Sequence, residues 1–111
     1  MNVKRGTTPT LRICLKTVDM SLVKRIDFVF KEQKKEQSKV LITKSYPENG
    51  GIYNMEKDFI ELSFTDSETR LFPSECKIYM DTRIVLNDGS IPETSISEFY
   101  INPTLFAEGT K

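Results

Sequence analysis

The fold of this chain is decided by residues 75–101, ECKIYMDTRIVLNDGSIPETSISEFYI. In the first half of this stretch, apolar side chains occupy one parity and charged side chains the other. The apolar set is Ile78, Met80, Ile84 and Leu86, and the charged set is Lys77, Asp81 and Arg83. A period of two is typical of a strand that buries one face. The alternation therefore predicts a long strand with one side against a core.

A chain reversal is predicted directly after this strand, at Asn87-Asp88-Gly89. Glycine adopts positive φ without a Cβ clash, and Asn and Asp can hydrogen-bond their own backbone. The return arm keeps one face apolar at three positions, Ile91, Phe99 and Ile101. Ile96 falls on the opposite face, so a bulge or break is expected between Thr94 and Ser97. Pro92 favours an edge position or a late start of the second strand.

Length and charge limit the classes of function. The chain has 111 residues, enough for one domain whose core needs no metal or disulfide. Lys and Arg together number 16, as do Asp and Glu, so no net charge favours nucleic acid or an anionic membrane. The N-terminus has no apolar signal region, and no run approaches the ~20 apolar residues of a membrane span. We therefore expect a soluble, leaderless domain that binds neither nucleic acid nor membrane.

Four further segments alternate in the same way and predict shorter strands. Their apolar residues are Leu11, Ile13 and Leu15; Ile26, Phe28 and Phe30; Val40 and Ile42; and Ile60, Leu62 and Phe64, with Ile52 and Tyr53 pairing upstream of the last set. Turn-forming residues separate them at 19–22 and 46–51, and the mixed charges of residues 31–39 indicate a solvated loop. Phe28 and Phe30 are expected to be buried and to bring the largest aromatic contribution to the core.

One short helical turn is predicted near residues 66–71. Thr65 and Glu68 form a capping box, in which the hydroxyl and the carboxylate satisfy free amides of the first helical turn. Pro73 ends this turn. Leu71 and Phe72 are expected to pack under the edge of a sheet.

Short strands between turns, with no helix of normal length, predict an all-β fold. We expect an antiparallel immunoglobulin-like β-sandwich, preferred over a barrel, because the gaps between strands are too short for parallel crossovers. Residues 1–10 are predicted to be a polar N-terminal arm that orders on a neighbouring molecule. Residues 11–102 are predicted to be a single sandwich domain, and 103–111 a C-terminal tail with an apolar latch.

Catalytic signatures are scarce. Histidine is absent, which removes the commonest general base, nucleophile partner and zinc ligand. Cys14 and Cys76 are single and distant in sequence, so neither a redox pair nor a metal pair is expected, and both thiols are expected to be free. A small hydrolase with a carboxylate pair is a minor alternative, drawn from Asp58, Glu61, Asp66, Glu68 and Glu75. We predict a protein that is not an enzyme and that uses no cofactor or metal.

Three side chains are candidate partner contacts. Tyr79 and Arg83 lie on the polar parity of the central strand, and Tyr100 is opposite in parity to its apolar neighbours. Tyr and Arg are enriched at protein interfaces. A purely structural interpretation is also open, in which Tyr79 and Tyr100 make a cross-strand pair.

Three stretches carry a resemblance to a known group of proteins. They are RGTTPT at 5–10, LSFTDSETRLF at 62–72 and RIVLNDGS at 83–90, which together extend over nearly the whole chain. They resemble small proteins encoded in the structural-gene regions of phages and prophages of Gram-positive bacteria. The resemblance implies a β-sandwich similar to the N-terminal modules of baseplate proteins, and it implies no catalytic residue. We expect the chain to lack the long fibre or receptor-binding extension that some of those modules carry.

The resemblance also implies a role and a location. The expected role is that of a structural or assembly protein in a tail, baseplate or head-fibre, whose partners are other virion proteins or copies of itself. The expected location is the cytoplasm of the bacterial host during synthesis and the virion afterwards. The alternative is a carbohydrate- or receptor-binding β-sandwich module, although the chain contains no Trp for a sugar platform.

Overall fold

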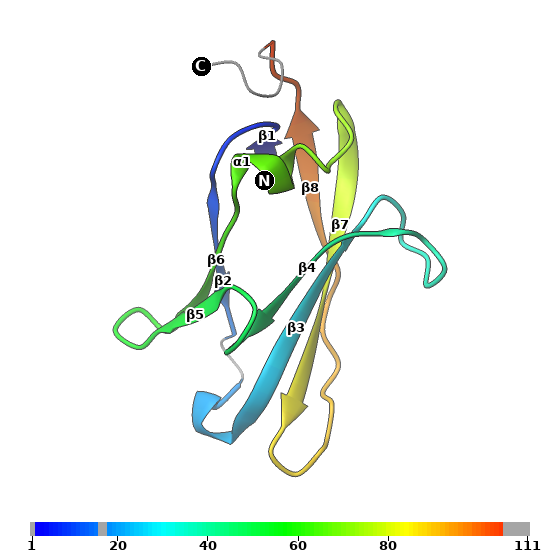
Figure 1. The fold of residues 1–111 in the computed structure, drawn as a ribbon. Helices are drawn as coiled ribbons and strands as arrows, with labels where there is room; N and C mark the ends of the chain where they lie inside the picture. Colours follow the sequence, from blue (N-terminus) through cyan, green and yellow to red (C-terminus); the bar gives the residue numbers. More distant parts are fainter. Residues whose placement is uncertain (1, 16–17, 106–111) are drawn as a thin grey trace.

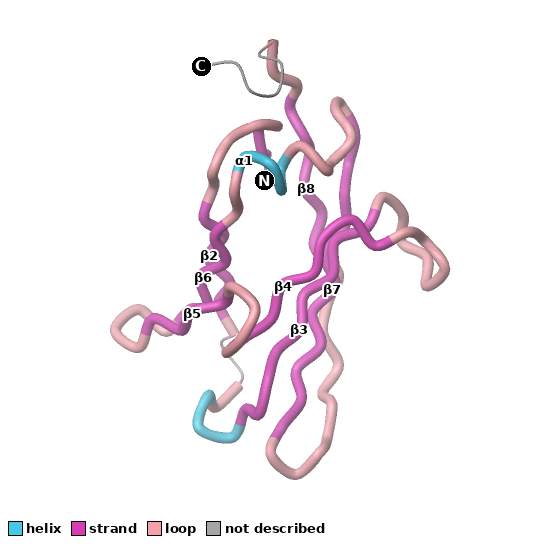
Figure 2. Tube along the Cα trace, viewed as in Figure 1, coloured by secondary structure: helices cyan, strands magenta, loops and turns pink. Residues whose placement is uncertain are grey.

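A computed structural model describes residues 2–15 and 18–105 of the chain. Two sheets pack face to face, as the two layers of strands in Figures 1 and 2 show. The five-stranded sheet has the order β1 (Asn2–Lys4), β8 (Ser97–Asn102), β7 (Cys76–Leu86), β3 (Val23–Lys31) and β4 (Val40–Tyr46). The three-stranded sheet has the order β2 (Thr10–Cys14), β6 (Phe59–Ser63) and β5 (Gly51–Asn54). The all-β, immunoglobulin-like sandwich is thereby confirmed.

The central strands β3 and β7 pair antiparallel and supply the middle of the core. Their inward side chains follow the predicted parity and are buried: Ile26, Phe28, Phe30, Ile78, Met80 and Ile84. Phe30 joins the two layers, since its ring lies edge-on to that of Phe64, which directly follows β6 of the other sheet, with centroids 5.4 Å apart. Phe72 and Phe99 complete this aromatic cluster. The alternation in the sequence therefore identified the core correctly.

The reversal after β7 is confirmed, but the return arm is not a strand along its whole length. The Leu86 amide donates to Ser90 O at 3.0 Å, and Gly89 has φ +87°. The second strand begins only at Ser97, and Ile91 is exposed instead of facing the core with Phe99.

The break before β8 has a physical cause in the register of the two strands. Met80 lies opposite Ser97, so continued pairing would set Ser95 against Thr82 and Glu93 against the buried Ile84. Burying a carboxylate without a partner is costly, and the chain leaves the sheet instead. The Thr94 hydroxyl donates to Thr82 O and so takes over one of the bonds that a paired strand would have made.

Gly89 provides a test of the turn. Gly89→Val should lower the free energy of unfolding by about 1 to 2 kcal/mol, because a β-branched residue resists positive φ. No heavy atom lies within 4 Å of a Cβ added at this position, so the cost would come from the backbone alone. Gly89→Asn is the matched control, and it should lose less because Asn tolerates this region. Urea unfolding measures both, and equal losses would contradict the assignment.

The predicted N-terminal arm is wrong for its first residues. Asn2–Lys4 form β1, which pairs parallel with β8, and Val3 is only 6% exposed. The other paired strands are antiparallel, so this edge is the exception to the predicted pairing. A single apolar side chain in three residues gives no periodic signal, which is why the sequence did not reveal β1.

Helix α1 (Asp66–Thr69) carries the predicted capping box and holds the N-terminal segment in place (Figure 1). The buried Thr69 hydroxyl accepts from the Gly6 amide at 3.0 Å and donates to Thr7 O at 2.9 Å. The Arg5 guanidinium donates to Phe72 O and to Arg70 O, at 2.9 Å each. These bonds join residues more than 60 positions apart in sequence.

The same helix is tied to β4 by an ion pair that is largely buried. Lys44 Nζ lies 2.7 Å from Glu68 Oε2 and also lies over the Phe64 ring, 5.1 Å from its centroid. Burial by itself would raise the pKa of Glu68, but hydrogen bonds from Lys44 and the Thr65 backbone, with the Lys44 charge, hold that pKa below its ordinary value. Of the two residues predicted to pack under the sheet edge, Phe72 is buried and Leu71 is exposed.

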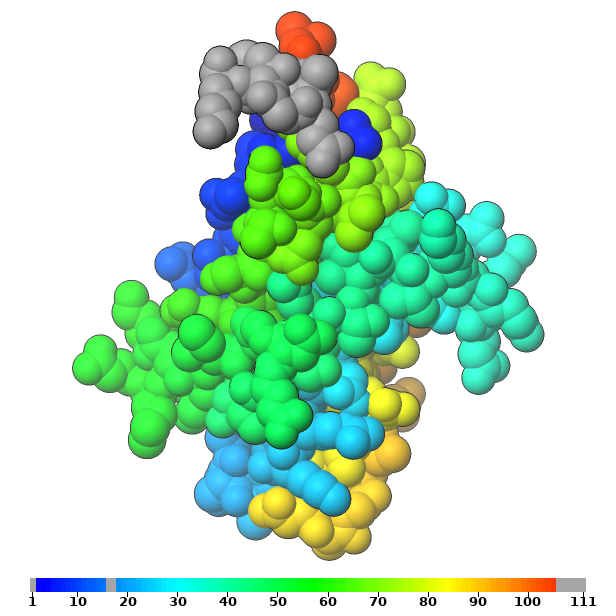
Figure 3. All heavy atoms as spheres, viewed as in Figure 1, coloured from blue at the N-terminus to red at the C-terminus, as the bar shows by residue number. Residues whose placement is uncertain are grey.

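The remaining connections lie at the surface. Residues 32–39 form the predicted charged loop, which projects from the body of the molecule in Figure 3, whereas Lys31, predicted to belong to the loop, ends β3. Met20–Leu22 form a single 3-10 turn, η1, capped by the Asp19 carboxylate. Leu105 is fully exposed and makes no latch, and Phe106 lies outside the described residues.

Candidate functional site

The candidate contact residues lie on the outer face of the five-stranded sheet, but not as one group. Tyr79 of β7 lies opposite Glu98 of β8, and Tyr100 lies opposite Lys77. The two tyrosines are therefore diagonal neighbours and not a direct cross-strand pair. Arg83 lies four positions further along β7, opposite Asp27 of β3.

Tyr79 is covered in part by the charged loop. Lys34 Nζ lies over the Tyr79 ring, 5.3 Å from its centroid, and 3.2 Å from Glu98 Oε1. A pocket of about 320 Å³ lies between the loop and the sheet, lined by Val29, Tyr79 and Ile96. The cover provided by Lys34 is a contact that sequence parity could not reveal, because it depends on how the loop folds back.

Arg83 belongs to an ion cluster around Asp27. Its Nη2 lies 2.9 Å from Asp27 Oδ2, Arg25 Nε lies 3.1 Å from the same oxygen, and the Ser45 hydroxyl donates to Oδ1 at 3.0 Å. Burial alone would raise the pKa of Asp27, but the bonds from Arg83, Ser45 and Arg25 lower it. The Arg83 guanidinium is thus engaged within the sheet, and a partner would have to compete with Asp27 for it.

Two of the carboxylates considered for hydrolysis, Asp58 and Glu68, have structural partners. Glu68 closes the capping box and pairs with Lys44, and Asp58 accepts a hydrogen bond from the Tyr53 hydroxyl at 2.6 Å. In the described part of the chain, no three His, Cys, Asp or Glu side chains come together in a way that could hold a metal ion.

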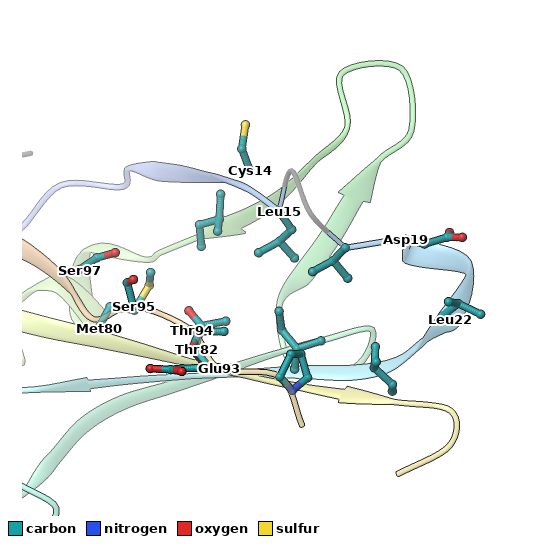
Figure 4. A pocket seen from close by; sticks show the side chains of 15 residues that line it. Cys14, Leu15, Asp19, Leu22, Met80, Thr82, Glu93, Thr94, Ser95 and Ser97 are labelled. Carbon is teal, nitrogen blue, oxygen red and sulfur yellow. Dashed lines mark hydrogen bonds between the residues drawn. The ribbon is translucent and has the colours of Figure 1, made fainter. Parts of the chain in front are cut away.

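A further site was not foreseen from the sequence. An open groove of about 650 Å³ lies between β2 and the end of β7, and Figure 4 shows Leu15 pointing into it from above. The groove lies where residues 92–95 run beside β7 without forming a strand, before β8 begins at Ser97. Its lining is mainly apolar, with Asp19 at one end and Glu93 on the β7 side. Glu93 and Ser95 are the sequence signal that could have located the groove. They are polar residues at positions that would face the core if β8 continued back along β7.

The two cysteines are free, and only one of them belongs to this groove. Cys14 is exposed at the edge of β2 (Figure 4). Cys76 is half-buried, and its Sγ donates to Pro73 O at 3.4 Å. Burial raises the pKa of the Cys76 thiol, and the charge of Glu32 adds to this rise.

Thiol kinetics should distinguish the two sites. Near neutral pH, Cys14 is expected to react with a disulfide reagent at least about tenfold faster than Cys76, because only the exposed thiolate attacks readily. Single Cys14→Ser and Cys76→Ser variants assign each phase of the reaction. Equal rates would contradict the burial of Cys76.

Comparisons with known proteins give no family. No protein-family model matches this chain, and no curated protein matches it in sequence. A solved structure of the extracellular domain of the voltage-gated sodium channel beta4 subunit, reported as parallel homodimers with a role in cell-cell adhesion, matches with a TM-score of 0.42 and 11% identity. The match covers 93% of this chain and 87% of that one, and it assigns neither a family nor a function. Among the described residues, no helix is long and apolar enough to cross a membrane.

Proposed function

We propose that this chain is a non-enzymatic structural or assembly protein of a phage or prophage particle, acting through protein–protein contacts in a tail, baseplate or head-fibre. The observation that carries the contact role is the apolar groove between β2 and β7, where an opening between the sheets adjoins an unpaired strand edge. The resemblance at residues 5–10, 62–72 and 83–90 supports the placement in a particle. Its partners would be other virion proteins or copies of itself.

The structure favours this proposal over the carbohydrate-binding alternative. A sugar platform needs an open aromatic face, and the Tyr79 ring is occupied by Lys34. Of the two tyrosines, Tyr79 and Tyr100, only Tyr100 is exposed, at 39%. A glycan array probed with the isolated chain would detect such binding, which this proposal expects to be absent.

The experiment that tests the proposal is quantitative mass spectrometry of particles. Cells that carry the phage are induced, and virions and assembly intermediates are purified by density gradient. The chain should be found in a fixed ratio to a tail or baseplate protein. An abundant host protein, measured as the control, should be depleted from the purified particles. Absence of the chain from both virions and intermediates would overturn the proposal.

A further inference from the structure

Asn49 and Gly50 form an exposed Asn-Gly pair in the connection between β4 and β5. Asparagine is a chemically labile residue, because the backbone nitrogen of the next residue can attack its side-chain amide carbon within the same chain. The next residue obstructs this attack through its side chain, and glycine, which has no Cβ, obstructs it least. Asn49 is the one asparagine of this sequence that glycine follows. The sequence thus indicates one position, and the structure shows how it is held.

The backbone at this pair leaves the attacking nitrogen free of the sheet. Gly50 forms an isolated parallel bridge with Ser45 of β4, and the Ser45 amide donates to Asn49 O at 2.9 Å. In such a bridge the bonded residue of one strand engages the two neighbours of its partner, so the Gly50 N–H points away from β4. Gly50 is also exposed. Its nitrogen is therefore not engaged by β4, and the residue that carries it lies at the surface.

Asn49 is restrained by two hydrogen bonds, and its side chain is held by one of them. Its Nδ2 donates to Thr43 O at 3.1 Å in an exposed position, and its backbone oxygen accepts from Ser45. Exposed connections open locally at a small cost in free energy, without unfolding of the domain. Rotation of the Asn49 side chain toward the Gly50 nitrogen is therefore accessible from the folded state.

The turn after β7 provides an internal comparison, because Asp88-Gly89 can form the same five-membered ring. There the Gly89 amide donates to Leu86 O at 2.9 Å, so the attacking nitrogen is engaged. The Asp88 carboxylate accepts from the Ser90 hydroxyl and the Ser90 amide, and these bonds lower its pKa. An ionised carboxylate has no good leaving group. The fold therefore protects Asp88 and leaves Asn49 reactive.

We propose that Asn49 is a site of spontaneous deamidation in the folded protein. The Gly50 nitrogen forms a bond to Asn49 Cγ, the bond from Cγ to Nδ2 breaks, and ammonia leaves with the proton of the Gly50 amide. Water then opens the resulting succinimide at either carbonyl. Opening at Cγ gives aspartate, and opening at the backbone carbonyl gives isoaspartate. One water is consumed and one ammonia released, and no oxidant or reductant takes part.

The new carboxylate would lie in a charged hollow of about 560 Å³ on the surface beside β4. The charged residues that line this hollow are three bases and two acids: Lys24, Arg25, Arg83, Asp27 and Glu48. One more negative charge would balance the three bases, so the aspartate form should be tolerated electrostatically. The cost of that form is the hydrogen bond from Nδ2 to Thr43 O.

Isoaspartate would disturb the structure more than aspartate, because it lengthens the main chain by one carbon. The insertion would lie between the Asn49 Cα and the carbonyl that accepts from Ser45. The next strand has no slack at this point, since a Cβ added at Gly51 would lie 2.7 Å from Ser45 O. The added carbon should therefore break the bridge between β4 and β5.

The test is peptide mapping by mass spectrometry of the full chain, incubated at mildly alkaline pH in the folded state and in guanidinium chloride. In the folded chain, Asn49 should convert at least about tenfold faster than Asn54, which methionine follows. Folding should slow Asn49 by no more than about tenfold relative to the denatured chain. It should slow isomerisation at Asp88 by more than that, because both reacting groups are hydrogen-bonded there. Asn49→Gln is the control that should remove the conversion.

Thermal melting separates the effects of charge and of backbone length. Asn49→Asp should melt within about 4 °C of the parent, because it loses a single exposed hydrogen bond. The aged chain should contain a fraction that melts below Asn49→Asp. Treatment with an isoaspartyl methyltransferase and its methyl donor, which returns isoaspartate to aspartate, should raise that fraction to the melting temperature of Asn49→Asp.

Three results would overturn the inference. They are conversion of Asn49 no faster than that of Asn54 in the folded chain, conversion of Asn49 only after denaturation, and isomerisation of Asp88 as fast as conversion of Asn49 in the folded chain. Each of these readouts is made on the purified chain. They are independent of whether the chain is detected in virions, so the particle role and the modification site can fail separately.

Discussion

Replacing Phe28 by alanine is expected to lower the free energy of unfolding by about 3 to 5 kcal/mol. Phe28 is 0% exposed and lies in the centre of β3, with Thr82 opposite on β7 and Lys44 opposite on β4. Removal of the ring would leave a cavity beside these two buried polar side chains. The neighbouring strands are held by long ladders on both sides of β3, so the site could collapse only in part.

Urea unfolding followed by circular dichroism measures this loss. Val29→Ala is the matched control, because Val29 is the next residue on β3 and faces the outer side of the sheet. We expect Val29→Ala to cost less than about 1.5 kcal/mol. A loss below about half a kcal/mol for Phe28→Ala would contradict the parity on which the core assignment depends.

The core could be predicted from the sequence because its evidence is local. Ile26, Phe28 and Phe30 recur at every second position, so neighbouring positions are enough to place them on one face. The capping box at Thr65 and Glu68 is likewise contained in four residues. Features of this kind need no knowledge of which strands become neighbours.

The candidate site could be predicted only in part, because it depends on contacts between distant segments. Parity placed Tyr79 and Tyr100 on one outer face, but the contact of Lys34 with Tyr79 requires the fold of a loop. The groove depends on the register of β7 with β8. Glu93 and Ser95 interrupt the pairing only because this register would place them on the core-facing side, and the sequence alone does not reveal the register.

Truncation of residues 2–8 is expected to destabilise the domain, because residues 2–4 form β1 and pair with β8 in the sheet. The deletion would remove β1, expose the edge of β8, and take two of the bonding partners of the buried Thr69 hydroxyl. It would also remove Arg5, whose guanidinium fixes the turn after α1. Leaving buried polar groups without partners and opening apolar surface should together cost about 2 to 4 kcal/mol.

Thermal melting of the truncated and full-length chains tests this expectation, with single variants to divide the effect. Val3→Ala removes only the buried side chain of β1, Arg5→Gln removes the guanidinium, and Lys4→Ala alters an exposed position between them. We expect Lys4→Ala to stay within about 0.5 kcal/mol of the parent and the other two to lose more. If the truncated chain melted at the temperature of the full-length chain, β1 would contribute nothing to the domain. The N-terminal segment would then be free to order on a neighbouring protein, and a loss of particle incorporation on truncation could be attributed to a lost contact and not to unfolding.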